Sequence, residues 1–379
     1  MLTRSKRRNE KTAKNVSSVR RLPRICLVVY ALTGVSLILY LLFRRNPAFS
    51  DAFNYSISAA LRASLGILTT WIPLSLAELL LLLLPLWLFL LIRTASRHYV
   101  SSRHNATVYL GILLSILCTV AVLFVFTFAP GYYGRTLDEK LELPREKVSA
   151  TELYDTAESL RAELVRLTPE IQFEEDGSSR MPYGREEMNR KLLHAYEKLS
   201  DKYDFIHSFP SRVKPVLLSE AMSYTHITGV YTFFTGEANL NVRFPDYTLP
   251  FTAAHELAHQ RGIAREDEAN FVAYLVCMES DDPYLRYSGT LSLYEYVASA
   301  LYSADPTLYA QCNDLLPKEV HAEELAFSRF FDKYRENIVA EVSEATNNAY
   351  LQSQGAPEGT RSYNLVVDLA VAHYKAQKS

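Results

Sequence analysis

Three long apolar segments dominate the first third of the chain. Residues 25–43 and 108–129 contain no charged side chain, and residues 71–92 contain only Glu78. About 20 apolar residues in a helix cross the roughly 30 Å of hydrocarbon in a bilayer. The pattern therefore predicts three transmembrane helices, at about 25–43, 71–92 and 108–129, with a kink at Pro85 in the second.

The ends of these segments leave two further expectations. The first segment lacks the small-residue cleavage site of a secretory signal peptide, so we expect it to be retained. Glu78 is a carboxylate inside an apolar segment, which favours a functional role in a membrane protein. A carboxyl group near the outer interface would instead be protonated or reach the headgroups. The sequence leaves both interpretations of Glu78 open.

After Pro130 the pattern changes to apolar residues at helical spacing among charged ones. Residues 149–167 open with Ser149 and Glu152 at capping-box spacing, and residues 184–202 resume the helical pattern. Asp-Pro pairs place an N-cap acid before a first-turn proline and predict further helix starts. The remaining helices are expected to begin near residues 283 and 306 and to cover about 322–350 and 361–376.

Residues 236–244 show the period-two alternation of a strand with one buried face. The apolar positions are Ala238, Leu240 and Val242, and the polar positions are Glu237, Asn239 and Asn241. Residues 215–234 are rich in β-branched and aromatic side chains and predict one or two partner strands. We expect the strand with these three polar residues to be an edge strand that holds an extended substrate by backbone hydrogen bonds. The predicted fold class is α+β, mainly helical, with a small sheet after the transmembrane helices.

Basic residues indicate the orientation in the membrane. Lys and Arg are abundant in residues 1–24 and recur in the 93–107 connection. Short cytoplasmic segments carry the excess of these residues. We therefore expect a cytoplasmic N-terminus over 1–24, a membrane region over 25–130 and an extracytoplasmic domain over 131–379. Arg44 and Arg45, beyond the first span, oppose this orientation weakly.

Charge and cysteine content restrict the partners. The formal net charge is −2, and no basic patch interleaved with aromatic residues follows the spans, which argues against a nucleic-acid partner. The expected partners are the lipid bilayer and a peptide or protein substrate; the sequence does not indicate an oligomeric state. Cys277 and Cys312 lie in the expected outer domain, where they either form a disulfide or remain buried thiols.

The candidate chemistry lies in the segment H-E-L-A-H, residues 255–259. Pro250 suits the first turn of a helix and Gly262 suits the position after its end, so the segment is expected to be helical. Histidines four residues apart then share a face and could bind one Zn²⁺ at roughly 2.0–2.1 Å, with Glu256 close enough to act on bound water. The alternative is an ordinary helix whose histidines bond to neighbouring backbone.

A third ligand is expected from the acids that open the next helix. Glu266 would share a face with small residues, which lets its helix approach the histidines, whereas Glu268 would share a face with bulky apolar residues. Glu266 is therefore the expected ligand and Glu268 the alternative. Asn270, on the same face as Glu266, is a candidate to orient a liganding histidine.

These residues also resemble known families. The H-E-x-x-H segment followed by E-D-E-A-N, residues 266–270, is similar to the gluzincin-type metallopeptidases, in which the first glutamate of the second motif is a ligand. Residues 214–275, 280–291 and 350–369 resemble a bacterial membrane family of unknown function, the domain of unknown function 3810 family. The resemblance implies a zincin-like outer domain and a zinc peptidase, and it implies no substrate.

The resulting hypothesis is a membrane-anchored zinc metallopeptidase. Zn²⁺ held by His255, His259 and Glu266 would lower the pKa of its water toward 7, and Glu256 would take the proton as the water attacks a peptide carbonyl. A donor to the developing oxyanion is also required. The candidate donors are Tyr224, His226, Arg286, Tyr287 and Tyr363. Two alternatives stay open: a zinc-bound sensor or binding module that signals through the spans without cleaving, and a structural envelope protein with a packed polar cluster.

Overall fold

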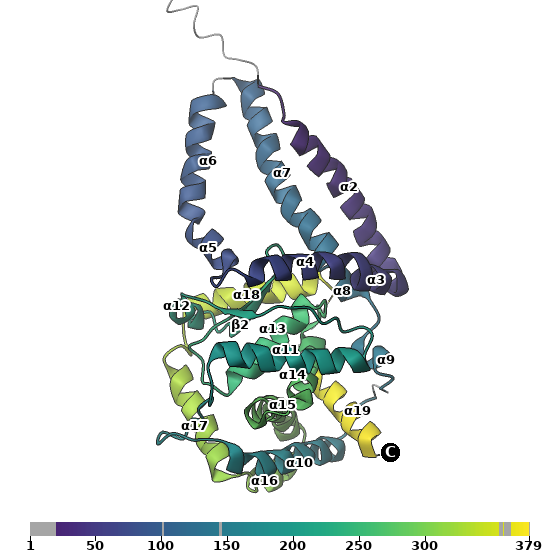
Figure 1. Cartoon of the computed structure of the whole chain (residues 1–379), viewed down its shortest axis with the longest axis vertical. Coiled ribbons are helices and arrows are strands. Elements are labelled where there is room, and N and C mark those ends of the chain that lie inside the picture. The colour runs from purple at the N-terminus through teal and green to yellow at the C-terminus, as the bar shows by residue number, and fades with distance from the viewer. Residues whose placement is uncertain (1–19, 101, 144–145, 356–358, 360–364, 379) are drawn as a thin grey trace, which may run out of the picture. The chain divides into compact units, whose positions relative to one another are not determined.

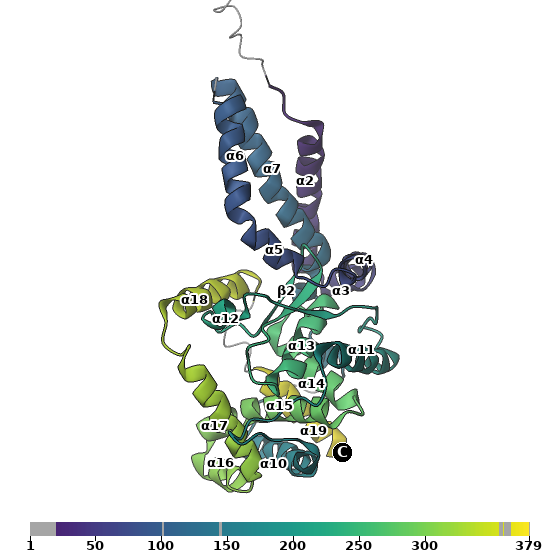
Figure 2. The ribbon, with the colours of Figure 1, turned by 60° about the vertical axis from the view of Figure 1, so that its left-hand side comes forward.

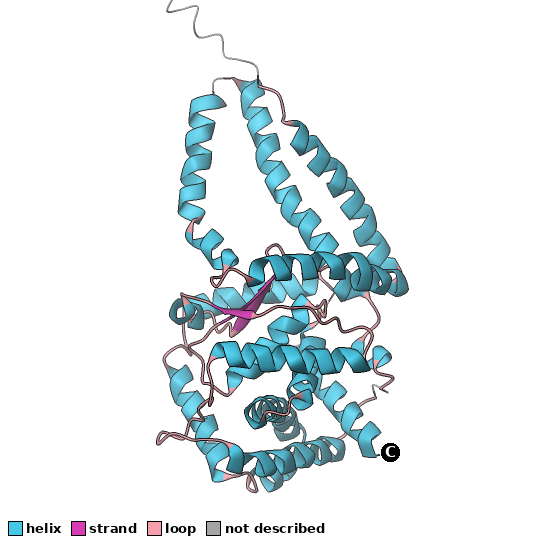
Figure 3. Cartoon of the chain, viewed as in Figure 1, coloured by secondary structure: helices cyan, strands magenta, loops and turns pink. Residues whose placement is uncertain are grey.

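The computed structural model describes residues 20–100, 102–143, 146–355, 359 and 365–378. The described chain is mainly helical with one small three-stranded sheet (Figure 3). In chain order the main elements are α2 (Arg24–Arg45), α3 (Pro47–Phe53), α4 (Ala59–Thr70), α5 (Leu76–Leu82), α6 (Leu84–His98), α7 (Arg103–Thr127), α10 (Ala150–Leu167), α11 (Arg185–Lys202), β1 (Val213–Pro215), α12 (Ser219–Ser223), β2 (Gly229–Thr232), β3 (Glu237–Leu240), α13 (Thr248–Gln260), α14 (Glu266–Glu279), α15 (Pro283–Ala304), α16 (Pro306–Asn313), α17 (Lys318–Asp332), α18 (Ile338–Ser353) and α19 (Val366–Lys378).

Contacts divide the chain into two compact units. The first comprises residues 1–39 and 79–125, and the second comprises residues 40–78 and 126–379. The segment 40–78 therefore belongs with the long C-terminal region, although it lies between two apolar segments in the sequence. The hydropathy pattern gave no indication of this grouping.

Two helices, α2 and α7, are long and apolar enough to cross a membrane. The helices α5 and α6 satisfy the same criteria together, but they are bent by 53° at their junction, so the described residues contain two such spans or three. Pro85 lies in the first turn of α6. Because proline removes a backbone donor and clashes with the preceding turn, the predicted kink is confirmed at this junction.

Within the first unit, α2 approaches α7 closely at Gly111. The Tyr30 hydroxyl donates to the Gly111 carbonyl, and a Cβ at this glycine would lie 3.0 Å from a Leu22 methyl carbon. The outer faces of these helices expose large apolar side chains such as Leu37 and Leu117. Exposed aliphatic surface of this kind suits a hydrocarbon environment.

The second unit is built around helix α15, which is seen end-on in Figure 1. Helices α10, α13, α14, α16 and α19 all pack against α15, and Figure 2 shows the same core from the side. Its first residues are capped by Asp282, whose carboxylate accepts from the Tyr284 and Leu285 amides. Asp305 caps α16 in the same way, and Ser149 and Glu152 form a capping box at α10. All three predicted caps are confirmed.

The single helix expected over 322–350 is wrong. The structure has two helices there, α17 and α18, separated at residues 333–337. Asn337 has an extended backbone, and its side chain accepts from the Ala340 amide, so it caps the start of α18. The last helix, α19, begins at Val366; residues 361–364 of the predicted helix lie outside the described residues.

The sheet order is β1-β3-β2, so β3 is the central strand. It runs parallel to β1, with Val213 opposite Ala238, and antiparallel to β2, with Gly229 opposite Leu240. The expectation that Glu237, Asn239 and Asn241 lie on an edge strand is therefore wrong. All three side chains are buried. The strands at the two edges of the sheet are β1 and β2.

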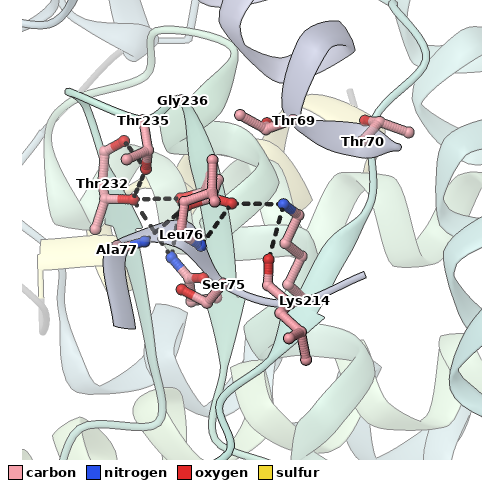
Figure 4. Close-up of polar contacts among 12 residues, drawn as sticks. Thr69, Thr70, Ser75, Leu76, Ala77, Lys214, Thr232, Thr235 and Gly236 are labelled. Carbon is pink, nitrogen blue, oxygen red and sulfur yellow. Dashed lines mark hydrogen bonds and ion pairs between the residues drawn. The ribbon is translucent and has the colours of Figure 1, made fainter. Parts of the chain in front are cut away.

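The polar side chains of the central strand have buried partners, which explains the misleading pattern. The Glu237 carboxylate forms an ion pair with Lys214 and accepts from the amides of Leu76 and Ala77 at 3.0 and 3.1 Å. Figure 4 shows Lys214 beside Leu76 and Ala77 at the start of α5. Asn241 donates to Ser223 and to the Ile227 carbonyl. A period-two pattern thus marks alternate faces here, but neither face is exposed.

Glu78 has backbone partners within the same unit. Its carboxylate accepts from the amides of Leu217 and Leu218 at 2.8 and 2.7 Å, just ahead of α12. The side chain is 8% exposed. Glu78 therefore satisfies two backbone donors of a turn.

Candidate metal centre

Helix α13 positions both histidines of the H-E-L-A-H segment. Pro250 lies in its first turn, and Gly262, with φ of +95°, follows its end in the left-handed conformation that favours glycine. The four-residue spacing places His255 and His259 on one face, with ring centroids 4.6 Å apart and ring planes at 89°. The helical position predicted for the two histidines is confirmed.

The C-terminal end of α13 is held by the segment between the first two apolar stretches. Asn54 Nδ2 donates to the Gly262 carbonyl at 3.0 Å, and Arg62 donates to the Arg261 carbonyl at 3.3 Å. Arg62 is fully buried and also donates to the Thr127 carbonyl at 2.7 Å. Because the last carbonyls of a helix lack internal partners, these side chains satisfy them.

Glu266, at the start of α14, completes a group of three possible ligands. Its Oε2 atom lies 3.2 Å from His255 Nε2 and 3.4 Å from His259 Nε2. The candidate ligand atoms of the three residues all lie within 4.8 Å of one another. A tetrahedral ion with bonds of roughly 2.0–2.1 Å separates its ligand atoms by about 3.3 Å. The group could therefore hold a metal ion with little rearrangement.

A backbone carbonyl fixes the ring of His259. Its Nδ1–H donates to the Ile263 carbonyl at 2.7 Å, in the turn after α13. In the neutral ring this bond places the single N–H proton on Nδ1 and leaves the Nε2 lone pair directed at the ligand group. His255 Nδ1 is buried and has no hydrogen-bond partner among the described residues. Both Nε2 atoms are thus available for a common ion.

Glu256 lies between the two histidines in sequence and is 4% exposed. Its Oε2 atom has no hydrogen-bond partner among the residues that the structure describes. A Cβ at Gly229 would lie 2.6 Å from Glu256 Oε1, so the carboxylate rests directly against the backbone at the start of β2. A buried carboxylate oxygen without a partner is costly unless it meets another molecule.

The charges of these groups shift one another's pKa. Burial raises the pKa of Glu256 to about 7, with the two histidines opposing this shift and Glu266 adding to it. Burial lowers the pKa of His259, but the Glu266 carboxylate outweighs it and raises the value to about 9. The pKa of Glu266 is lowered despite its burial, because both histidines favour the carboxylate. Glu266 is therefore an anion at neutral pH, as a ligand to a cation must be.

Glu268, the alternative third ligand, is excluded by its partners. Its Oε1 atom accepts from Arg265 at 2.8 Å and from the Leu137 amide at 2.9 Å. It therefore points toward the chain around Leu137 and does not join the histidines. Asn270 likewise forms no hydrogen bond with a histidine among the described residues, and its Nδ2 lies 3.4 Å from the Tyr296 hydroxyl. The Ile263 carbonyl has the orienting role that the sequence suggested for Asn270.

A cavity of about 700 Å³ opens beside the ligand group. His255, Glu256 and Asn270 line one part of it, and residues of α15 line another, among them Glu295 and Tyr296. Thr228 and Gly229, at the start of the edge strand β2, also border it. No sequence pattern marked the two α15 residues, because they lie far along the chain from the H-E-L-A-H segment and the protein has 25 tyrosines.

The five candidate oxyanion donors are distributed over the unit. His226 lines the cavity, and its Nε2 is 2.6 Å from the Tyr334 carbonyl. Tyr224 packs edge-on against the Tyr334 ring. Arg286 pairs with Glu163 at 2.8 Å, and Tyr287 donates to Glu323 at 2.9 Å, so both are occupied elsewhere. Tyr363 lies outside the described residues. Only His226 of the described four borders the cavity.

Both cysteines of the second unit are buried free thiols. Cys277 lies against Gly289, and the Cys312 sulfur is 3.9 Å from the Tyr294 hydroxyl. Burial raises the pKa of Cys312 to about 11, so this thiol is not reactive at neutral pH.

Comparison with known proteins gives one match. A family model described as Protein of unknown function (DUF3810) matches residues 53–371 of the 379. The matched range contains α13, α14 and the helices that line the cavity. No curated protein and no solved structure matches the chain.

Proposed function

The chain belongs to this family of unknown function, and from the residues around its candidate metal centre we propose that it is a membrane-anchored, zinc-dependent peptidase. The observation that carries the proposal is the convergence of His255, His259 and Glu266 at distances of 3.2 and 3.4 Å, beside a buried carboxylate with an unpartnered oxygen. Two imidazoles and a carboxylate leave one open position in a tetrahedral zinc site, which is typical of catalytic sites.

When bound, the ion would supply Lewis acidity toward water and a peptide carbonyl. Glu256 is the general base: its free Oε2 takes a proton from the attacking water and afterwards gives it to the leaving amine nitrogen. The burial of Glu256 favours a carboxylate that can take up a proton and return it. The backbone at Gly229 lies so close to the Glu256 carboxylate that it restricts where the carboxylate can move.

Tyr296 is the best-placed donor to the developing oxyanion. It lines the cavity together with His255 and Glu256. Because Asn270 Nδ2 approaches the Tyr296 oxygen as a donor, the hydroxyl proton of Tyr296 is left to be donated into the cavity. His226 also lines the cavity, but its Nε2 is already bonded to the Tyr334 carbonyl, so Tyr296 is the preferred donor. An extended peptide would lie along the edge strand β2, whose first residue, Gly229, lines the cavity.

For the cellular location we propose that the N-terminus is cytoplasmic and that the metal centre lies on the outer face. The support is the abundance of Lys and Arg in residues 1–24 and 93–107, and it requires α5 and α6 to form one bent span.

The test combines zinc content with turnover. The full chain, purified in detergent, is expected to bind one zinc ion and to cleave casein or a random peptide library, whereas Glu256→Gln keeps the zinc and loses turnover by roughly 10²–10⁴-fold. Equal turnover by both proteins would remove Glu256 as the base. Zinc without turnover in the unmodified protein would favour a non-cleaving sensor, and absence of zinc would favour a structural polar cluster.

A further inference from the structure

The cavity beside the ligand group has an acidic lining. Three carboxylates border it, those of Glu256, Glu295 and Glu344, and no lysine or arginine does so among the described residues. The remaining polar groups there are neutral hydroxyls and amides or histidines. A recess lined by one sign of charge, with walls that exclude water, concentrates the opposite charge.

Among these carboxylates, Glu295 has the surroundings that most favour binding of a cation. It is half-buried on α15, and one oxygen accepts from the Tyr247 hydroxyl at 2.9 Å. In the described part of the chain it forms no ion pair with Lys, Arg or His. Burial, together with the nearby carboxylates of Glu324 and Glu323, raises its pKa to about 8. A positive charge placed against the carboxylate would oppose this rise in its pKa.

The position of Glu295 relates it to the reacting groups. The adjacent residue, Tyr296, lines the same cavity and is within reach of Asn270 on the helix that provides Glu266. Glu256 also borders the cavity; the residue is 4% exposed, and its Oε2 atom has no hydrogen-bond partner among the described residues. A ligand that contacts both residues would therefore place its uncharged, reacting part beside Glu256 and a cationic group beside Glu295.

We infer that the cavity recognises a peptide substrate through a cationic group, a Lys or Arg side chain or a free amino terminus, that pairs with the carboxylate of Glu295 close to the bond that is cut. The inference rests on the proposed peptidase function, because it treats the bound peptide as a substrate. Recognition of the cation is a matter of binding and does not require cleavage. Glu295 acts on specificity and takes no part in proton transfer. Tyr247 holds one carboxylate oxygen and leaves the other for the incoming group.

The test measures binding, so that it does not depend on turnover. The full chain in detergent, zinc-loaded and carrying Glu256→Gln, is titrated into fluorescent hexaalanine peptides with a lysine, arginine, norleucine or citrulline at each position in turn. Each peptide is made with a free and with an acetylated amino terminus. We expect the cationic residue at one position, or the free terminus, to bind at least tenfold more tightly than its neutral counterpart.

Two further variants assign the preference. Adding Glu295→Gln is expected to abolish the preference while the neutral peptides still bind, and Glu295→Asp is expected to retain it. Glu324→Gln is the matched control, because it removes a nearby carboxylate that pairs with His321 and does not line the cavity. Equal binding of cationic and neutral peptides, a preference that survives Glu295→Gln, or an equal loss for all peptides would overturn the inference. Failure of the peptidase function would appear separately, as zinc-loaded unmodified protein that binds these peptides and cuts none.

Discussion

At the scale of single residues, two glutamates two positions apart on α14 have different partners. Glu266 faces the two histidine Nε2 atoms, whereas Glu268 binds Arg265 and the Leu137 amide. A rotation of about 200° around the helix separates the two positions, since each residue advances the helix by about 100°. The choice between them therefore follows from which face of α14 meets α13.

The first prediction compares these glutamates. Glu266→Gln is expected to weaken zinc affinity by more than the roughly 10–100-fold that loss of an outer-shell partner costs, because it removes a charged ligand. Glu268→Gln should leave zinc affinity unchanged and lower stability by about 1–3 kcal/mol through its buried hydrogen bonds. Competition with a chromogenic zinc chelator measures the affinity. A greater loss of zinc in Glu268→Gln would exclude the assigned triad.

The second prediction concerns Gly229, at the start of β2. A methyl group there would lie 2.6 Å from Glu256 Oε1 and 2.7 Å from its Cγ, so Gly229→Ala must displace the carboxylate. A displacement near 1 Å can cost about 10²-fold in rate. We expect turnover to fall by roughly that factor with zinc stoichiometry unchanged. Gly184→Ala, where no atom lies within 4 Å of the added carbon, is the control and should keep full turnover.

At the scale of elements, local signals predicted helices better than the sheet. The Ser149–Glu152 box and the two Asp-Pro pairs are contained in a few neighbouring residues, and all three began helices as expected. Strand order depends instead on distant partners. Glu237 looked exposed because the buried Lys214 and the α5 amides that satisfy it lie far away in sequence.

The same contrast holds for the candidate site. The two histidines could be predicted because residues four apart share a helix face, and Glu256 because it lies between them in the H-E-L-A-H segment. Glu266 could be predicted from the small residues that share its face. Glu295 and Tyr296 could not, because only the fold of α15 against α13 and α14 brings them to the cavity.

The third prediction tests the link between the sheet and helix α5. Glu237→Gln leaves Lys214 as a buried charge without its partner, which is expected to destabilise the second unit by about 3–5 kcal/mol. Unfolding of the full chain in detergent, followed by intrinsic fluorescence, measures the change. Glu220→Gln is the control, since that carboxylate pairs with Lys333 and Arg243 at the surface and should matter far less. Similar effects of the two substitutions would contradict a structural role for the buried pair.

At the scale of the whole molecule, the bent pair α5–α6 decides the topology. If it crosses the membrane as one span, the chain has three spans and its two ends face opposite sides; if it re-enters, both ends face the same side. The fourth prediction is three crossings. Alkaline phosphatase fused to the C-terminus should be active and green fluorescent protein fused there should be dark. The reverse pattern would place the metal centre in the cytoplasm.

The contacts of Asn54 and Arg62 with the end of α13 have a consequence for how a proteolytic cut beside the bilayer would affect the candidate metal centre. Many ectodomains are shed when a second protease cuts the stalk beside the bilayer. Here a cut just after Thr127 would release a piece from which the buried guanidinium that supports the histidine helix is missing. If the chain is the surface peptidase proposed above, we expect such a cut to end its activity instead of releasing an active enzyme, because the histidine helix would lose this support.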